Sequence, residues 1–357
     1  MVRILHLLDH AADFETARSS ESLARAVGEG FDVVRRTIGY GGDYRDVATA
    51  AAMLRRSDLP FDLIHAWGGA ALAVAALGAT TPMVFSPSPE SRGRTIRWLR
   101  AVMSYRRVEV ISPTFTLRRT LVQRGIPIDR CHLSRPGVEF ARIRKKRDLE
   151  LRARLGLSET DYVFLAAGES TRAAAHIAAT WAVSILHVAD PKYKILIWGK
   201  GPGREGVVHF AEKTMPTVLR VADLPEYEDL LPAADMVLVT AKNAVATLPI
   251  AISMAANMPI VASVTPTVAE LLEDRHTALM TTNKPKQIAQ RILDLVDDTN
   301  QQWQLADMAR TEAYEYFSFT RFVNQFRAIY RQVQLGQSVQ VPEQGPGAGL
   351  RFHGRVS

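Results

Sequence analysis

The chain has 357 residues, of which 47% are hydrophobic and 23% are charged, a balance typical of an ordinary soluble globular protein. So long a chain rarely forms one core, and we therefore expect two domains. The single cysteine, Cys131, excludes an internal disulfide and disfavours a zinc cluster, while the net charge of +7 favours anionic partners.

The first residues predict a strand, 2–8, rather than a targeting segment. The small-residue cleavage site of a signal peptide is missing, and no apolar run approaches the length of a membrane span. The lone cysteine also fits a reducing compartment. We therefore expect a cytoplasmic protein.

Short apolar runs, each followed by a turn and a helix-compatible stretch, predict parallel strands covered on both faces. They fall at 2–8, 61–67, 83–86 and 108–112 in the first half, and at 162–167, 195–198, 218–221, 236–239, 260–262 and 277–280 in the second. Two such series predict two Rossmann-like, doubly wound α/β domains, 1–140 and 141–315, facing each other across a cleft. Ligands of this architecture bind at the carboxyl ends of strands, so the cleft is the expected site.

Two basic segments lie in and after the first domain. The stretch 92–107 holds six arginines and no acid, interleaved with apolar residues. It predicts either a helix that presses an apolar strip into an anionic membrane at the inner face, or a solvated helix whose strip faces the core. The run 142–147 is expected to be an exposed linker at the domain boundary.

The C-terminal part of the chain predicts one helix and a tail. Over 316–335, Phe319, Phe322, Phe326 and Tyr330 recur at helical spacing, which predicts an amphipathic helix packed on another element. From 336 onward the composition turns to Gly, Pro and Gln, and we expect 336–357 to be disordered.

Several motifs with known chemistry are missing from the sequence. There is no Gly-x-Gly-x-x-Gly after the first strand, no phosphate loop ending in Gly-Lys-Ser/Thr, and no Gly-x-Ser-x-Gly elbow. No Asp-x-Asp pair or His/Cys cluster follows a strand, and no nucleic-acid-binding module is present. We therefore expect no cofactor, no metal and no nucleic-acid partner.

The turns after the second-domain strands carry the candidate anion-binding groups. Gly168 ends a strand before a helix start, where backbone amides and the helix dipole hold phosphate, and Arg172 is placed to add a charged contact. Alone, Arg172 is equally an exposed arginine of a first helical turn. The loop 199–205 brings Gly199, Lys200 and Gly201 close to a base or a phosphate, although by itself it is a turn.

The uncharged segment 243–269 predicts a buried helix that leads to a buried strand. Thr247 is the predicted N-cap of this helix, with Pro249 in its first turn. Its N-terminus is expected to face the cleft and to attract an anion. Lys242, just before it, is a further candidate for contact with a diphosphate.

From about 108 to 334 the chain resembles glycosyltransferases of the GT-B fold, especially family 4, the glycosyl transferases group 1. Gly125-Ile126-Pro127 and the turn 135–139 resemble the end of that family's first domain. The segments 195–205 and 223–241 resemble its second-domain strands and loops. The segment 254–281 is similar to its "MAAGlPVVAS" region, and 316–334 resembles the helix that crosses back to the first domain.

The resemblance implies an enzyme that transfers a hexose, with retention and without a metal, from a nucleotide-diphosphate sugar to a glycan or lipid acceptor. It also implies functional residues that this chain has changed. The family's Glu-x7-Glu pair falls on Val245 and Ser253, and its phosphate-binding Arg and Lys fall on Glu169 and Ala174. Ser253 remains able to hold a ribose hydroxyl, and His65 stands at the tip of a strand as a catalytic or a structural residue.

These changes leave alternatives open. One is a divergent glycosyltransferase whose diphosphate is held by Arg172, Lys200 and Lys242 with the amides near Gly168 and Thr247. Another is a degenerate relative that binds a nucleotide, a glycan or a partner without turnover. A GT-B epimerase is a third, less well matched by the linker and the last helix.

Overall fold

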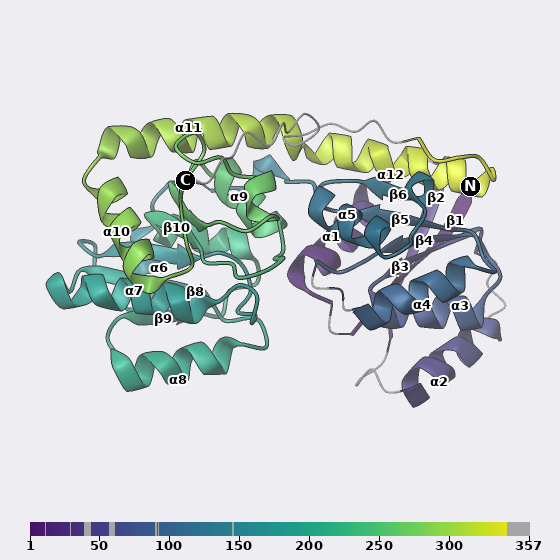
Figure 1. The fold of residues 1–357 in the computed structure, drawn as a ribbon, viewed down its shortest axis with the longest axis horizontal. Coiled ribbons are helices and arrows are strands. Elements are labelled where there is room, and N and C mark those ends of the chain that lie inside the picture. Colours follow the sequence, from purple (N-terminus) through teal and green to yellow (C-terminus); the bar gives the residue numbers. More distant parts are fainter. Residues whose placement is uncertain are drawn as a thin grey trace.

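The computed structural model describes residues 1–10, 12–28, 30–38, 44–56, 61–89, 91, 93–144 and 146–340. Its architecture is two parallel six-stranded sheets, each covered by helices on both faces, as the sequence predicts for a GT-B fold (Figure 1). The strands are β1 Val2–Leu8, β2 Phe31–Thr37, β3 Leu63–Trp67, β4 Met83–Ser86, β5 Val108–Ser112 and β6 Cys131–Leu133 in the first domain, and β7 Tyr162–Ala166, β8 Tyr193–Trp198, β9 Leu219–Ala222, β10 Met236–Val239, β11 Ile260–Ser263 and β12 Leu279–Thr281 in the second.

The helices between these strands complete both domains. They are α1 Phe14–Ala26, α2 Tyr44–Arg55, α3 Gly69–Gly78, α4 Gly93–Met103 and α5 Phe115–Gln123, then α6 Leu149–Arg154, α7 His176–Ala189, α8 Arg204–Thr214, α9 Leu248–Ala255, α10 Pro285–Val296 and α11 Thr299–Tyr316, and finally α12 Phe319–Gln334. Short 3₁₀ helices include η3 Tyr227–Ala233 and η4 Val268–Glu270.

The strand order of each sheet reverses direction once. The first sheet runs β2-β1-β3-β4-β5-β6 and the second β12-β11-β10-β7-β8-β9, with parallel pairing throughout. The reversal lies between β1 and β3 in the first sheet and between β7 and β10 in the second. Such switch points open a crevice at the carboxyl ends of the strands, where ligands of doubly wound folds bind.

Two of the strands were not predicted. The strand β2 is an edge strand whose far half, including Arg35 and Arg36, is exposed or half-buried, so it lacks an apolar run. The strand β6 has three residues, too short for a periodicity to show. Both extend the first sheet at its two edges.

The last helix crosses back to the first domain, as predicted. Figure 1 shows α11 along the second domain and α12 continuing along the first. On α12, Phe322, Phe326 and Tyr330 are buried in one core cluster with Ile4 of β1 and Leu63 of β3. The predicted domain boundary near residue 140 falls between β6, the last strand of the first sheet along the chain, and β7, the first strand of the second. Residues 341–357 of the predicted tail lie outside the described residues.

The arginine-rich segment folds as α4 with its apolar side facing inward. Ile96, Leu99 and Val102 are at most 3% exposed and belong to the first-domain core, whereas Arg94, Arg97 and Arg100 are exposed. An apolar strip free to enter a membrane is therefore not present on this helix, and the core-facing interpretation is correct. Arg92 lies outside the described residues. No helix in the described ranges is long and apolar enough to cross a membrane.

Candidate active site between the domains

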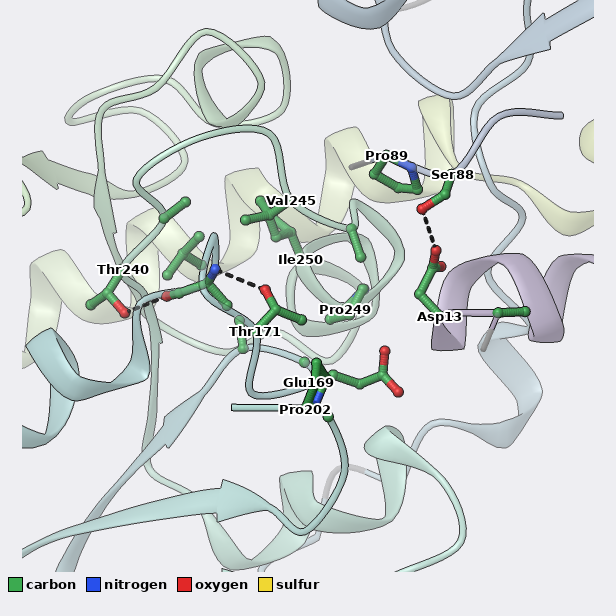
Figure 2. A pocket seen from close by; sticks show the side chains of 18 residues that line it. Asp13, Ser88, Pro89, Glu169, Thr171, Pro202, Thr240, Val245, Pro249 and Ile250 are labelled. Atoms are coloured by element: carbon green, nitrogen blue, oxygen red, sulfur yellow. Dashed lines mark hydrogen bonds between the residues drawn. The ribbon is translucent and has the colours of Figure 1, made fainter. Parts of the chain in front are cut away.

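The first domain brings the start of α1 to the carboxyl edge of its sheet. Asp13 caps this helix, since its carboxylate accepts from the amide of Thr16 at 2.9 Å. The hydroxyl of Ser88, two residues beyond β4, donates to the same carboxylate at 2.7 Å. Asp13 is thus held in one orientation at the cleft (Figure 2).

Two glycines shape the second-domain side. Gly168 follows β7 with φ of +73°, and a Cβ there would lie 2.8 Å from Cγ of Pro249 in the first turn of α9. Gly201 follows β8 with φ of +103°, and a Cβ there would lie 2.5 Å from the carbonyl oxygen of Ser170. Only glycine fits such positive φ angles and close approaches without strain. The loops after β7 and β8 therefore pack backbone against backbone.

Hydrogen bonds join these two loops. The amide of Ser170 donates to the carbonyl of Lys200 at 2.9 Å, and the amide of Gly203 donates to the carbonyl of Ser170 at 2.7 Å. Nδ1 of His176, a residue that is 2% exposed, is hydrogen-bonded to Oγ of Ser170 at 2.9 Å. This loop pair forms a fixed floor beside the carboxyl end of β7.

A cavity of about 460 Å³ lies where the two switch points face each other. It is lined by Ala12, Asp13, Ser88 and Pro89 of the first domain and by Ala167, Gly168, Glu169, Thr171, Ala174, Gly201, Pro202, Val239, Thr240, Ala241, Val245, Ala246, Pro249 and Ile250 of the second. Figure 2 shows Glu169 extending from the second domain toward the side where Asp13 stands. A cavity of this size holds a ligand as large as a nucleoside or a sugar nucleotide fragment.

The charge of this lining is negative. Asp13 and Glu169 are its carboxylates, and no Lys or Arg belongs to the lining among the described residues. The remaining lining is mostly alanine, proline and aliphatic side chains. A phosphate bound here would therefore depend on backbone amides, on helix N-termini, or on cations that reach in from outside the wall.

A carboxylate of the first domain occupies the N-terminus of α9. Oε2 of Glu15 accepts from the amide of Leu248 at 2.8 Å, from Oγ1 of Thr247 at 3.1 Å, and from the amide of Thr247 in a shorter bond. Glu15 is 4% exposed, and burial together with the charge of Asp13 raises its pKa to about 7. The predicted N-cap, Thr247, stands at the cap position but makes no side-chain cap bond to its own helix.

The same part of α1 makes further contacts with the second domain. The amide of Phe14 donates to Oε2 of Glu169 at 3.0 Å, and the Phe14 ring packs edge-on against Trp198 with centroids 4.9 Å apart. One turn later, Arg18 forms ion pairs of 2.7 Å with Glu226 and 2.6 Å with Glu228. The start of α1 is therefore fixed to the second domain by charged, polar and aromatic contacts.

The predicted donor-binding residues are divided between the wall and the surface. Gly168 and Gly201 line the cavity, and Thr247 adjoins it between the lining residues Ala246 and Pro249. Four predicted residues lie outside the lining: Arg172, Lys200 and Lys242, each adjacent in sequence to a lining residue, and Gly199, two residues before Gly201.

The three predicted cations are exposed. The ammonium of Lys200 donates to the carbonyl of Pro225 at 2.7 Å and lies 4.5 Å from the Trp198 ring centroid, so it points away from the cavity. Gly199 instead allows Asp223 to approach, since a Cβ there would lie 1.8 Å from its carboxylate. Arg172 and Lys242 stand at the surface with no ion pair among the described residues.

His65 does not lie in the cavity, contrary to the catalytic interpretation. It is fully buried in the first-domain core, with Nδ1 2.7 Å from the Tyr330 hydroxyl and Nε2 2.9 Å from the Ser86 hydroxyl. Burial lowers the pKa of its imidazole well below the usual value. Both ring nitrogens are engaged, and His65 is a structural residue that joins the sheet to α12.

Ser253 is likewise absent from the cavity lining. Its hydroxyl is fully buried one turn and a half into α9, where it donates to the carbonyl of Pro249 at 2.7 Å and lies 3.0 Å from the Tyr227 hydroxyl. These contacts fix η3 against α9. A ribose hydroxyl therefore has no access to Ser253 in this arrangement.

The acidic residues of the cleft were not predicted as site residues. Asp13, Glu15 and Glu169 meet here from two domains, and sequence reasoning noted Glu169 only as a replaced position. One local signal was available: Asp13, five residues after the first strand and three before Thr16, has the spacing of a helix N-cap.

The described residues contain no group of three or more His, Cys, Asp or Glu side chains arranged to hold a metal.

Comparisons with known proteins agree with this architecture. Residues 148–313, in the second domain, match the family model described as glycosyl transferases group 1. A search of curated protein sequences finds no match.

The chain is similar in fold to several solved glycosyltransferase structures. Anabaena HepE in complex with UDP and glucose superposes with a TM-score of 0.77 at 17% identity, covering 93% of this chain and 100% of that one. Sucrose-phosphate synthase from Thermosynechococcus elongatus gives 0.76 at 15% identity, covering 94% and 100%. A glycosyltransferase from Rickettsia africae gives 0.73 at 13% identity, covering 93% and 98%. The GT-B fold predicted from the sequence is confirmed.

Proposed function

We propose that the protein is a glycosyltransferase that binds a nucleotide-diphosphate sugar in the interdomain cavity and transfers the sugar to a glycan or lipid acceptor without a metal. The position of the cavity carries this proposal. It lies at the facing switch points of both sheets, beside the glycine loops after β7 and β8. The family of the second domain and the UDP in the HepE structure support the same ligand class.

In the proposed reaction the bond between the sugar C1 and the diphosphate oxygen breaks, and its electron pair leaves with the nucleoside diphosphate. The acceptor oxygen forms a bond to C1, and its proton passes to the departing diphosphate. The departing diphosphate needs electrostatic stabilisation. Gly168 and Gly201 offer bare backbone, and the N-terminus of α9, which holds the Glu15 carboxylate in this structure, is a position that stabilises an anion. Arg172 and Lys242 reach the diphosphate in this proposal by changing rotamer at the edge of the cavity.

Donor binding is the first test. The melting temperature is measured with UDP, GDP, ADP and their hexose derivatives, since a ligand of the folded state raises it by mass action. We expect one nucleotide series to bind, and Arg172→Ala to weaken that binding by about 1.5 to 3 kcal/mol. Absence of a shift with every nucleotide would overturn the proposal.

Turnover is the second test. The binding donor is incubated with the protein alone and with candidate glycan and lipid acceptors, and release of the nucleoside diphosphate is followed. A metal-independent transfer keeps its rate when EDTA is added. Complete loss of the rate with EDTA would contradict the metal-independent part, and the anomeric configuration of the product decides between retention and inversion.

A second candidate is a binding module that holds a nucleotide or glycan without turnover. The composition of the cavity wall favours it, since Asp13 and Glu169 contribute negative charge and Val245 is apolar at the position of a family carboxylate. Losing one preorganised charged contact removes about 3 to 4 kcal/mol of transition-state stabilisation. Saturable donor binding with no release of diphosphate in any assay would select this candidate.

Contact with an anionic membrane through 92–107 would be electrostatic, because the apolar side of α4 is buried. The exposed Arg94, Arg97 and Arg100 supply the charge for it. Sedimentation with anionic vesicles at low and high salt tests the contact, since salt screens exposed charges. Equal pelleting with neutral vesicles would contradict it.

A further inference from the structure

We propose that Glu15 is an internal competitor of the donor: its carboxylate occupies the anion-binding N-terminus of α9, and a donor phosphate binds there only after Glu15 withdraws. The proposed function supplies the identity of the donor on which this inference rests. The contact itself is a feature of the protein's own residues. It makes Glu15 a residue that determines which ligands enter the closed cavity.

The contact has the form of a bound anion. The amides of Thr247 and Leu248 and the hydroxyl of Thr247 all donate to one oxygen, Oε2 of Glu15. First-turn amides of a helix have no partner within the helix, and the helix dipole makes their position favourable for negative charge. These donors are fully used by Glu15, so a phosphate oxygen cannot use them at the same time.

The contact lies at the wall of the large cavity. Ala246 and Pro249, the residues on either side of the Thr247-Leu248 pair, both line it. On the opposite side, Glu15 lines a second, small cavity of about 30 Å³ together with Trp67 and Phe326. The carboxylate thus stands between the two spaces, and a ligand in the large cavity that extends an anion toward α9 meets it.

Among the residues that the structure describes, no Lys or Arg forms an ion pair with Glu15. The charged group that acts on it most is Asp13, a like charge on the same helix start. Arg18, one turn later, is engaged by Glu226 and Glu228 of the second domain. A buried carboxylate held by two amides and one hydroxyl, with no opposite charge beside it, can be displaced by a group with more negative charge.

Withdrawal of Glu15 is linked to the opening of the cleft. The residue before it, Phe14, donates its amide to Glu169 and packs its ring on Trp198. Since Phe14 and Glu15 are neighbours at the start of α1, a withdrawal of Glu15 large enough to vacate α9 would also disturb the contacts of Phe14. A donor that binds at α9 would favour a more open arrangement of the domains than the one seen here.

The experiment compares nucleoside diphosphates with nucleosides on charge variants. Binding of UDP, GDP and ADP, and of uridine, guanosine and adenosine, is measured by calorimetry on the full chain and on Glu15→Ala and Glu15→Gln. Glu15→Ala vacates the α9 N-terminus, whereas Glu15→Gln keeps the volume and removes the charge. Glu21→Ala is the matched control, because Glu21 lies on α1 with no hydrogen bond or ion pair to the second domain in the described ranges.

We expect both Glu15 variants to bind one nucleoside diphosphate on the order of tenfold to a hundredfold more tightly than wild type and Glu21→Ala, which is the range for charged hydrogen bonds. Affinity for the nucleoside should stay within about twofold, since it has no phosphate. If Glu15→Ala unfolds, as judged by its melting curve, Glu15→Gln decides the result.

The outcomes separate the two proposals. Diphosphate binding that appears only in the Glu15 variants supports the competitor role and shows that the wild-type protein does not bind the donor. Equal diphosphate affinity in wild type and both variants overturns the competitor role and leaves the proposed function standing. Absence of binding in every protein overturns both.

Discussion

The phenolic oxygen of Tyr330 lies 2.7 Å from Nδ1 of His65 and joins the crossover helix α12 to the centre of the first sheet. The same oxygen lies 2.9 Å from Nε2 of His6, whose Nδ1 is 3.1 Å from the Ser20 hydroxyl. Both imidazoles are fully buried, and burial lowers the pKa of His6 to about 3. Both histidines are therefore neutral at physiological pH, and each has one of its two hydrogen bonds with Tyr330.

Removing this hydroxyl should destabilise the first domain. Tyr330→Phe leaves two buried imidazole nitrogens without their partner, and each unsatisfied group costs about 1 to 3 kcal/mol. We expect the urea midpoint to fall by the equivalent of about 2 to 6 kcal/mol in total. Tyr105→Phe is the control, because Tyr105 is 61% exposed and its change should stay within about 0.5 kcal/mol. Equal midpoints for the two variants would mean that water replaces the lost hydroxyl.

Gly168 sets the distance between the loop after β7 and the first turn of α9. In Gly168→Ala the new Cβ meets Cγ of Pro249 at 2.8 Å and the residue keeps a positive φ, so we expect a loss of about 1 to 3 kcal/mol. Donor affinity should fall as well, since α9 shifts away from the loop. Gly206→Ala is the matched control: Gly206 lies in α8 with nothing within 4 Å of its Cβ position, and alanine there should stabilise by about 0.5 to 1 kcal/mol. Parallel losses in both variants would contradict this assignment.

The sequence predicted the fold well because the apolar runs are local signals. The strands β7, β8, β10, β11 and β12 are largely buried runs, and each coincides with a predicted strand to within a few residues. The strand β9 was also predicted, although only its last residue, Ala222, is buried. The edge strand β2 has no such run, since solvent faces most of it. Its pairing with β1 is a tertiary fact that periodicity does not contain.

The site was predicted only in part, because it is made between domains. Gly168 and Gly201 could be found from their place after strands. Glu15 could not, because it lies 232 residues from Thr247 in the chain, and only the closed arrangement brings them together. Ser253 and His65 were assigned by the family pattern and by position at a strand end, and burial in the core excludes both from the cavity.

Glu270 makes a second interdomain helix cap that can be tested separately from the cavity. Its two carboxylate oxygens accept from the amides of Phe115, at 2.8 Å, and Thr116 at the start of α5. Glu270→Gln places an amide group against one of these donors, so we expect a loss of about 1 to 3 kcal/mol and an increased radius of gyration in solution scattering. Glu273→Gln changes an exposed neighbour and should alter neither quantity. A compact Glu270→Gln protein of wild-type stability would show that this cap does not hold the domains together.

The raised pKa of Glu15 predicts a pH dependence of stability that a single variant isolates. Glu15 ionises near pH 4.5 when unfolded and near pH 7 in the folded protein, so between these values the folded state holds a proton that the unfolded state has lost. Its contribution to stability is therefore lost as the pH rises from about 4.5 to about 7, by about 3 kcal/mol in all. Buried histidines such as His6 act in the opposite direction, so the difference between Glu15→Gln and wild type is the quantity to measure. We expect Glu15→Gln to match wild type in unfolding free energy at pH 5 and to exceed it increasingly up to pH 8. A difference between the two proteins that stays constant over this range would show that the carboxylate at α9 ionises as an exposed glutamate does.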